Sequence, residues 1–185
     1  MKIWGGARVG CGVLAVCAAT FGVVRAQKKV HVDRPIVEAR AEDVGKIEGI
    51  VTASYETISG GVGVARQWGR DRTLFDPNSR SVAIHVDAKT GAIKTESMTE
   101  QDFADRSDGS IVKNGFTERE IKHIIHRYGN VATALSSYEG GDAAGKSKSR
   151  GVNIFQLYFD GKRWWILSMV WDEERPGNPI PAELQ

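Results

Sequence analysis

Apolar residues recur every three or four positions between residues 42 and 58, at Val44, Ile47, Ile50, Val51, Tyr55 and Ile58. This spacing places them on one face of a helix. Glu42 and Asp43 suit the first helical turn, where the helix dipole favours acidic side chains. The Ser-Gly-Gly sequence at 59–61 predicts the end of that helix.

Two further helices are predicted to be short. One covers about 66–74 and ends before the turn-forming sequence Asp-Pro-Asn at 76–78. The other is expected over 99–107, because Thr99 and Asp102 have the spacing of a capping box. Between them, the β-rich sequence SVAIHV is followed by the turn-forming sequence DAKTG. The first half of the chain is therefore expected to be mainly helical, with one strand.

The last third of the chain is predicted to be mostly strand. Three β-rich segments, 131–138, 152–159 and 163–171, are separated by turn-forming residues. The last two are joined through Asp-Gly at 160–161, which is a strong hairpin signal. The Pro-rich tail at 176–185 cannot continue a sheet, so it is expected to lie on the surface.

The segment 116–128 fits two interpretations. Its apolar residues have helical spacing, at Ile121, Ile124, Ile125 and Tyr128. Thr117 and Glu120 could also form a capping box, which favours a helix. The Gly-Asn turn at 129–130 and the strands beyond it favour the first strand of an antiparallel meander instead. Periodicity does not decide between helix and strand, because pairing with a neighbouring strand of a sheet can override the local helix propensity.

Helices followed by long antiparallel strands form the element order of an α+β domain. The first helix at 42–58, the sequence LFDPNS at 74–79 and the sequence YFDGKRWWILSMVWDEE at 158–174 resemble the nuclear transport factor 2-like (NTF2-like) superfamily, in its SnoaL-like branch. The resemblance implies a domain over 42–175 with a cone-shaped α+β fold. In this fold, N-terminal helices pack into a curved, mainly antiparallel sheet that leaves a cavity. It also implies that 116–128 is a strand.

Residues 1–26 have the three-part pattern of a secretory signal. Lys2 and Arg8 form a basic start, and Cys11–Val24 carries no charge. Small residues then precede Gln27, as expected for a cleavage site. The apolar run is short for a membrane-spanning helix, which needs about 20 residues. We therefore expect the signal to be cleaved, leaving no stable membrane span.

Cleavage would direct the protein to the periplasm or the outside of the cell. The alternative is lipoprotein processing at Cys17, for which the preceding Val16 is a poor fit because a small residue is expected there. The mature chain would begin with a flexible lead-in at 27–41, which is polar, contains Pro35 and shows no sustained period.

The charge and cysteine content change when the signal segment is set aside. The whole chain has 25 basic and 23 acidic residues, and three of the basic ones lie in residues 1–26. Both cysteines lie there as well. The remaining 159 residues are enough to bury a core without disulfides. Because their net charge is close to zero, they provide no overall basic field for nucleic acid.

Two motifs suggest ligands but fit simpler structures. The sequence GGDAAGKS at 140–147 satisfies the P-loop pattern. A phosphate site needs a helix directly after this loop, whereas a β-rich segment follows here. Glu120, His123 and His126 could share a helix face, but on a strand positions i and i+3 point to opposite faces. We therefore predict neither a bound metal nor a cofactor.

Alternation along the last strand predicts that both of its faces are apolar. Trp164, Ser168 and Asp172 have the same parity and are expected to face the cavity. The opposite parity gives Trp165, Met169 and Trp171. On the outside of the sheet these three residues would form a large patch that a monomer should not expose. The sequence therefore predicts a homodimer through the outer sheet face.

We expect the cavity to bind a small, partly apolar molecule, because a few polar groups within apolar walls are typical of ligand sites. The candidate ligand-binding residues are Tyr55, Asn153, Gln156, Trp164 and Ser168. The alternative is a lyase or isomerase that uses His126 or His123 with Asp172 as an acid–base pair. A third possibility is an interaction protein with a filled cavity. The fold alone does not choose among these functions.

Overall fold

The computed structural model describes residues 31–185. The predicted signal segment 1–26, including Cys17, and the first residues of the lead-in lie outside this range. The described helices are α1 (Ala41–Val44), α2 (Ile47–Ile58), α3 (Trp68–Arg72), α4 (Glu100–Asn114) and the C-terminal 3-10 helix η1 (Ala182–Leu184). The strands are β1 (Phe75–Val86), β2 (Ile93–Met98), β3 (Thr117–Tyr128), β4 (Val131–Gly141), β5 (Lys148–Phe159) and β6 (Trp164–Glu173).

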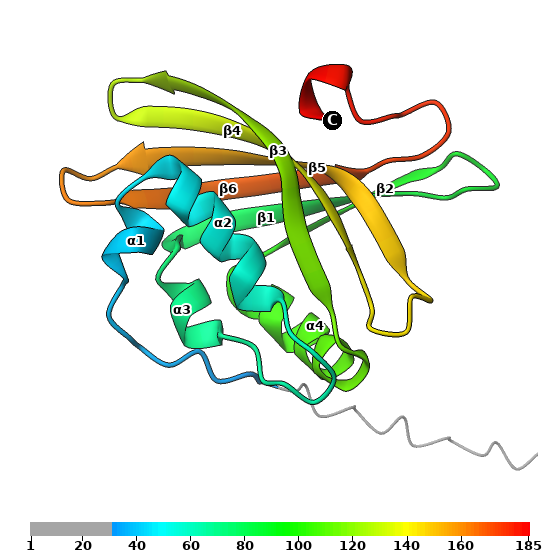
Figure 1. Cartoon of the computed structure of the whole chain (residues 1–185), viewed down its shortest axis with the longest axis horizontal. Helices are drawn as coiled ribbons and strands as arrows, with labels where there is room; N and C mark the ends of the chain where they lie inside the picture. Colours follow the sequence, from blue (N-terminus) through cyan, green and yellow to red (C-terminus); the bar gives the residue numbers. More distant parts are fainter. Residues whose placement is uncertain (1–30) are drawn as a thin grey trace, which may run out of the picture.

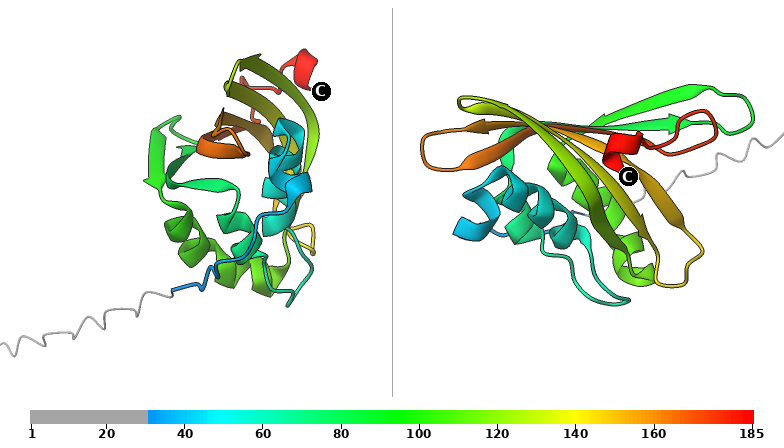
Figure 2. Two further views of the ribbon diagram at one scale, coloured as in Figure 1. Left: turned by 90° about the vertical axis from the view of Figure 1, so that its left-hand side faces the viewer. Right: turned by 45° about the horizontal axis from the view of Figure 1, so that its top comes forward.

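The strands form one six-stranded sheet in the order β2-β1-β6-β5-β4-β3. Neighbouring strands are antiparallel except β1 and β6, which are parallel. Figure 1 shows helices α1 to α4 on one side of the curved sheet and the C-terminal segment on the other. We call these two sides the inner face and the outer face. Figure 2 shows how the sheet twists and bends over the helices, which confirms the predicted α+β cone.

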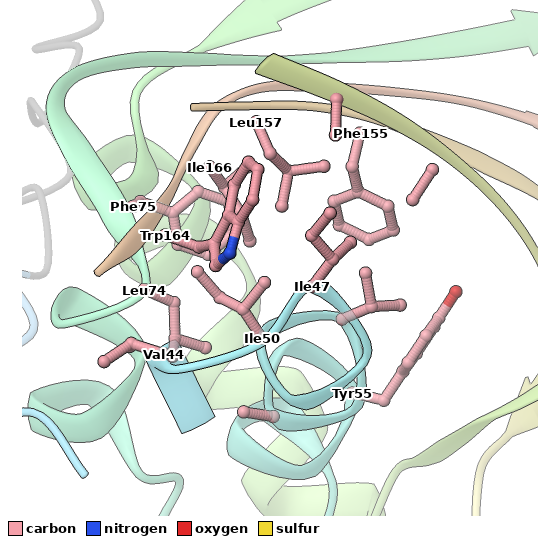
Figure 3. Close-up of a cluster of buried hydrophobic side chains, with 14 of the residues drawn as sticks. Val44, Ile47, Ile50, Tyr55, Leu74, Phe75, Phe155, Leu157, Trp164 and Ile166 are labelled. Carbon is pink, nitrogen blue, oxygen red and sulfur yellow. The ribbon is translucent and has the colours of Figure 1, made fainter. Parts of the chain in front are cut away.

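The main hydrophobic core lies between α2 and the inner face of the sheet (Figure 3). Ile50 and Val51 of α2 are almost completely buried, as are Phe155 of β5 and Ile166 of β6. The apolar spacing read from the sequence is therefore the face that α2 turns toward the strands. Each fully buried side chain of this size contributes roughly 1.5–3 kcal/mol relative to exposure.

The helix predicted over 42–58 is divided into α1 and α2 at Gly45. The amide of Gly45 donates to the carbonyl oxygen of Ala41 at 2.8 Å and closes α1. A side chain at Gly49 would place its Cβ 2.2 Å from the carbonyl oxygen of Glu42. The missing side chain therefore allows α1 to pack directly against α2.

The capping box predicted for the helix at 99–107 is present, since the Thr99 hydroxyl accepts from the Asp102 amide at 3.0 Å. The helix continues beyond the predicted end to Asn114, as α4. The strand β2 was not predicted, because it lies at the edge of the sheet and most of its residues are exposed and polar. The predicted turn at 76–78 is also part of a strand, the irregular first portion of β1.

The segment 116–128 is the strand β3, as the family resemblance implies and against its helical spacing. Glu120 pairs with Tyr138 of β4, and the next pair joins Lys122 to Ser137. Ile121 is therefore an extra residue, a β-bulge that reverses the alternation of side chains along the strand.

A second bulge interrupts β6 at Leu167. Leu157 of β5 pairs with Ile166, and the next residue along β5, Gln156, pairs with Ser168. The alternation predicted for the last strand therefore holds only up to Ile166 and is reversed beyond Leu167. Consequently Met169 and Trp171, which were expected on the outer face, belong to the inner face.

The tail at 176–185 lies on the outer face of the sheet, as expected from its prolines (Figure 1). Ile180 and Leu184 are buried there, and the Ser137 hydroxyl of β4 donates to the Leu184 carbonyl oxygen at 2.6 Å. The tail thus covers part of the outer face with apolar side chains.

Residues 31–40 form no helix or strand but contact the helices. The Val32 amide donates to Asp105 of α4 at 2.8 Å, and Gln101 donates to the Val32 carbonyl oxygen at the same distance. The described end of the predicted lead-in is therefore fixed to the domain. Within 31–185, none of the helices has the length and apolar character needed to cross a membrane.

Candidate functional site

A pocket of about 310 Å³ lies between α2, α4 and the inner face of the sheet. We call it the interior pocket. Its apolar wall is formed mainly by Ile58, Phe103, Ile111, Phe116, Met169 and Trp171. Its polar lining includes Tyr55, Glu100, Glu118, Tyr138, Asn153 and Glu173. Apolar walls with a few polar groups are the usual composition of small-molecule sites.

Tyr55 and Asn153 are the two predicted ligand-binding residues that line the interior pocket. The Asn153 side-chain amide donates to the Tyr55 hydroxyl oxygen at 3.0 Å. The Tyr55 hydroxyl also contacts the Ser136 hydroxyl at 2.7 Å. Burial raises the pKa of Tyr55 above its ordinary value, so the hydroxyl stays protonated.

This hydrogen-bond network continues away from the pocket to His123. The Ser136 hydroxyl donates to Glu120 at 2.6 Å, and the other carboxylate oxygen of Glu120 lies 3.0 Å from His123 Nδ1. The bulge at Ile121 is what places Glu120 and His123 on the same face. His123 itself does not line the interior pocket, so it is connected to Tyr55 only through Glu120 and Ser136.

Two glutamates that line the pocket have pKa values above the ordinary value for glutamate. Burial and the nearby Asp71 carboxyl together raise the pKa of Glu100 to about 7. Burial also raises the pKa of Glu118 to about 7, although a hydrogen bond with Asn153 partly opposes this shift. Since desolvation disfavours the charged form, both groups exchange protons near neutral pH.

Asp71 of α3 lines the pocket and is almost completely buried. Its carboxylate accepts from Arg34 at 2.6 Å and from the Thr57 hydroxyl at 3.3 Å. Burial raises the pKa of Asp71, and the Arg34 guanidinium opposes this shift. The ion pair links the segment before α1 to the floor of the pocket.

Three predicted ligand-binding residues lie elsewhere. Trp164 is buried in the main core, tilted against Phe159 with 5.6 Å between the ring centroids. Ser168 and Gln156 lie together on the outer face, where the Ser168 hydroxyl donates to Gln156 at 3.2 Å. Ser168 was expected on the inner side, and the bulge at Leu167 explains the difference.

The structure does not bring the predicted acid–base pair together. Asp172 lies beyond the bulge on the outer face, where it forms an ion pair with Arg175 at 2.5 Å. His126 is exposed and borders a shallow outer pocket with Leu167. His123 lies on the opposite face from both and contacts Glu120.

Several residues of the pocket were not found from the sequence. Phe103, Ser107 and Ile111 of α4 are four residues apart and line it together with Glu100. Their helical spacing is visible in the sequence, but the polar composition of this segment obscured it. Glu118 lies two residues before Glu120 and shares its face, so a correct strand assignment of 116–128 was the signal that would have found it.

The P-loop-like sequence at 140–147 covers the last two residues of β4 and the turn that leads to β5. The Asp142 carboxylate accepts from the amides of Lys146 and Ser147 at 2.9 and 3.1 Å. An aspartate thus binds the amides that would hold a phosphate, and a strand follows instead of a helix. Within residues 31–185, no group of three or more His, Cys, Asp or Glu side chains is arranged to hold a metal ion.

Comparisons with known proteins find similar structures at low sequence identity. An NTF2-like protein of unknown function from Shewanella baltica OS155 is 15% identical, with a TM-score of 0.44 over 68% of this chain and 86% of that chain. A similar protein from Methylobacillus flagellatus KT is 15% identical, with a TM-score of 0.46 over 70% and 90%. Hexachlorocyclohexane dehydrochlorinase LinA-type3 from Novosphingobium barchaimii LL02 is 9% identical, with a TM-score of 0.48 over 70% and 84%.

No family model matches this chain, and no curated protein sequence matches it. The order of helices followed by a curved, mainly antiparallel sheet is the architecture that the sequence resemblance implies. The chain has an α+β fold in which helices cover one face of a curved six-stranded sheet.

Proposed function

We propose that this protein binds a small, partly apolar molecule in the interior pocket. The observation that carries this proposal is the pocket of about 310 Å³, whose walls include the aromatic rings of Phe103, Phe116 and Trp171. A volume of this size suits a small ligand, and the polar network of Tyr55 and Asn153 supplies a fixed point for its orientation.

Filling part of the pocket should weaken ligand binding. Ser107 of α4 lines the pocket, and phenylalanine at this position would occupy part of the space that a ligand needs. We expect Ser107→Phe to weaken binding about tenfold or more. Isothermal titration calorimetry with 2-phenylethanol, 2-phenylethylammonium and 3-phenylpropionate measures this loss. The exposed Ser110 on the same helix provides the control Ser110→Phe, which should bind like the unchanged protein. Equal binding by both variants would place the ligand elsewhere.

The proposal does not include a lyase or isomerase reaction by His126 or His123 with Asp172. His123 lies on the inner face of the sheet, whereas His126 and Asp172 lie on the outer face. Asp172 also forms an ion pair with Arg175. A general acid and base must both reach the same substrate. A binding function requires only the pocket.

We also propose export, on the pattern of residues 1–26, which lie outside the described residues. The expected mature protein begins at Gln27, in the periplasm or outside the cell. The mass of the protein recovered from these fractions tests the cleavage site. A full-length mass would contradict it.

A homodimer through the outer face is the third part of the proposal. The apolar residues exposed on this face are Ile154, Leu167 and Val170, with 41%, 45% and 37% of their surfaces accessible. They replace the patch predicted from the sequence, because the bulge turns Met169 and Trp171 inward. Exposed apolar residues that cluster on one face favour association.

We expect sedimentation velocity to show a dimer at micromolar concentration. Ile154→Glu should convert it to a monomer, because a charge at the centre of the interface would lose its water. The matched control is Ile93→Glu on the edge strand β2, where Ile93 is exposed, and this variant should remain dimeric. A monomeric unchanged protein would disprove the dimer.

A further inference from the structure

The charged groups that line the interior pocket all have the same sign. Asp71, Glu100, Glu118 and Glu173 contribute to the lining. None of the residues that line it is a lysine, arginine or histidine. A ligand in this pocket therefore meets acidic groups at several points and no positive charge.

Among the four acids that line the pocket, Asp71 is the one that has a cationic partner within residues 31–185. Asp71 is paired with Arg34 at 2.6 Å. Glu100 accepts a hydrogen bond from the Ser81 hydroxyl at 2.5 Å, and Glu118 is hydrogen-bonded to Asn153. Within residues 31–185, neither glutamate forms an ion pair with a basic side chain. Each of these carboxyls would therefore gain from a cation that enters the pocket.

Tyr138 of β4 gives an independent sign of a missing partner. This side chain lines the pocket and is only 3% exposed. Unlike the hydroxyl of Tyr55, its hydroxyl has no hydrogen-bond partner among residues 31–185. Glu118 and Glu173 lie near enough to raise the pKa of Tyr138 electrostatically, in addition to its burial. The hydroxyl oxygen is not among the fully buried atoms that lack a partner, so it is open to the pocket, where an occupant can supply the missing hydrogen bond.

The apolar walls of the pocket contribute aromatic rings that can contact a cation. Phe103 of α4 and Trp171 of β6 meet edge to face, with ring centroids 6.5 Å apart and an angle of 78° between them. Both rings line the pocket. Aromatic rings attract cations through their negative faces and also pack against an apolar body. Acids and aromatic rings together are the groups that recognise an organic ammonium ion.

We infer that the ligand is a small organic cation, a protonated amine attached to an aromatic or aliphatic body. This inference rests on the proposed binding function and specifies its ligand. The ammonium group would donate to the Glu118 carboxylate and to the Tyr138 hydroxyl oxygen, while the apolar body lies against Phe103 and Trp171. Where Glu118 is protonated before binding, its proton is released to the solvent.

The pH dependence of binding follows from the groups around Glu118. Glu173 from β6, Tyr138 from β4 and Tyr55 from α2 are the titratable groups that face it from the packed elements. Because Glu118 has a pKa of about 7 in the free protein, an ammonium ligand must first displace its proton at lower pH. Affinity for the cation should therefore rise about tenfold between about pH 6 and pH 8. A neutral ligand that accepts a hydrogen bond from the protonated carboxyl would show the opposite trend.

The test compares three probes with the same phenyl body by isothermal titration calorimetry. We expect 2-phenylethylammonium to bind about tenfold more tightly than 2-phenylethanol at neutral pH, and 3-phenylpropionate to bind most weakly. If the alcohol or the carboxylate binds as well as the amine, the cation inference is wrong although the pocket still binds ligands. If none of the three binds, the proposed function fails and the inference fails with it.

Two variants of the protein locate the effect. Glu118→Gln should lower the affinity for the amine to near that of the alcohol and reduce the pH dependence, without changing the affinity for the alcohol. Glu139→Gln makes the same charge change at a partly exposed residue outside the interior pocket, so it should leave amine binding unchanged. Tyr138→Phe is nearly isosteric and should weaken amine binding roughly fivefold. Unchanged amine binding in both Glu118→Gln and Tyr138→Phe would overturn the inference.

Discussion

Replacing Arg34 with alanine is expected to lower the free energy of unfolding by about 3–5 kcal/mol. Asp71 is almost completely buried, and Arg34 is its only ion-pair partner among the described residues. The guanidinium holds the Asp71 carboxylate at 2.6 Å and is itself only 10% exposed in its side chain. Without Arg34, the structure must bury an unpaired charge or protonate the carboxyl, and both cost stability.

Urea denaturation monitored by circular dichroism measures this loss. The control is Arg80→Ala, since Arg80 is an exposed arginine on β1. Its effect should stay below about 0.5 kcal/mol. Adding Asp71→Asn to Arg34→Ala should recover part of the stability, because the unpaired charge is then removed. A loss of less than about 1 kcal/mol for Arg34→Ala would show that the ion pair does not hold this region together.

Replacing Phe155 with alanine should also destabilise the fold by about 3–5 kcal/mol. Phe155 is completely buried in the main core, and its ring meets the ring of Tyr55 edge to face at 6.5 Å. Truncation removes these contacts and leaves a cavity between β5 and α2. Because Tyr55 also lines the interior pocket, we expect the same variant to bind ligand less tightly.

The comparison is with Tyr128→Ala, an aromatic residue on β3 that is 87% exposed. That change should alter the free energy of unfolding by less than about 0.5 kcal/mol. Equal losses for the two variants would mean that burial of the aromatic ring does not determine stability here.

The regular periodicities of the sequence predicted much of the fold. The apolar face of α2, the capping box at Thr99 and the hairpin at Asp160-Gly161 are all local signals, and each is present in the structure. The segment 116–128 shows where local signals fail. Its isoleucines have helical spacing, yet pairing with β4 along its whole length makes it a strand. Tertiary pairing overrides propensity in such a segment.

The site was predicted less well, because two bulges decide which side chains face inward. The alternation along β6 assigned Asp172 to the cavity and Trp171 to the outside, and the extra residue Leu167 exchanges them. A one-residue insertion exchanges the inner and outer faces for every side chain beyond it. Neither bulge contains a distinctive residue type by which the sequence would reveal it. Tyr55 and Asn153 do line the interior pocket, and their binding of a ligand stays a prediction.

The acidic residues of the pocket were not predicted from the sequence, for another reason. Glu100 and Glu118 lie in polar segments that resemble exposed surface, and their burial depends on the packing of α4 against β1 and of β3 against α2. No pattern of spacing within one element distinguishes a buried glutamate from an exposed one. Only the three-dimensional arrangement shows that both line the same pocket.

The most direct test of ligand binding in the interior pocket is a ¹³C-methyl NMR titration of the methionines with 2-phenylethylammonium. Met169 lines the pocket, whereas Met98 is buried at the end of β2 outside it. We predict that the probe shifts the Met169 methyl resonance progressively until saturation and leaves the Met98 resonance in place. A saturating titration in which the Met169 resonance does not move would contradict binding in this pocket.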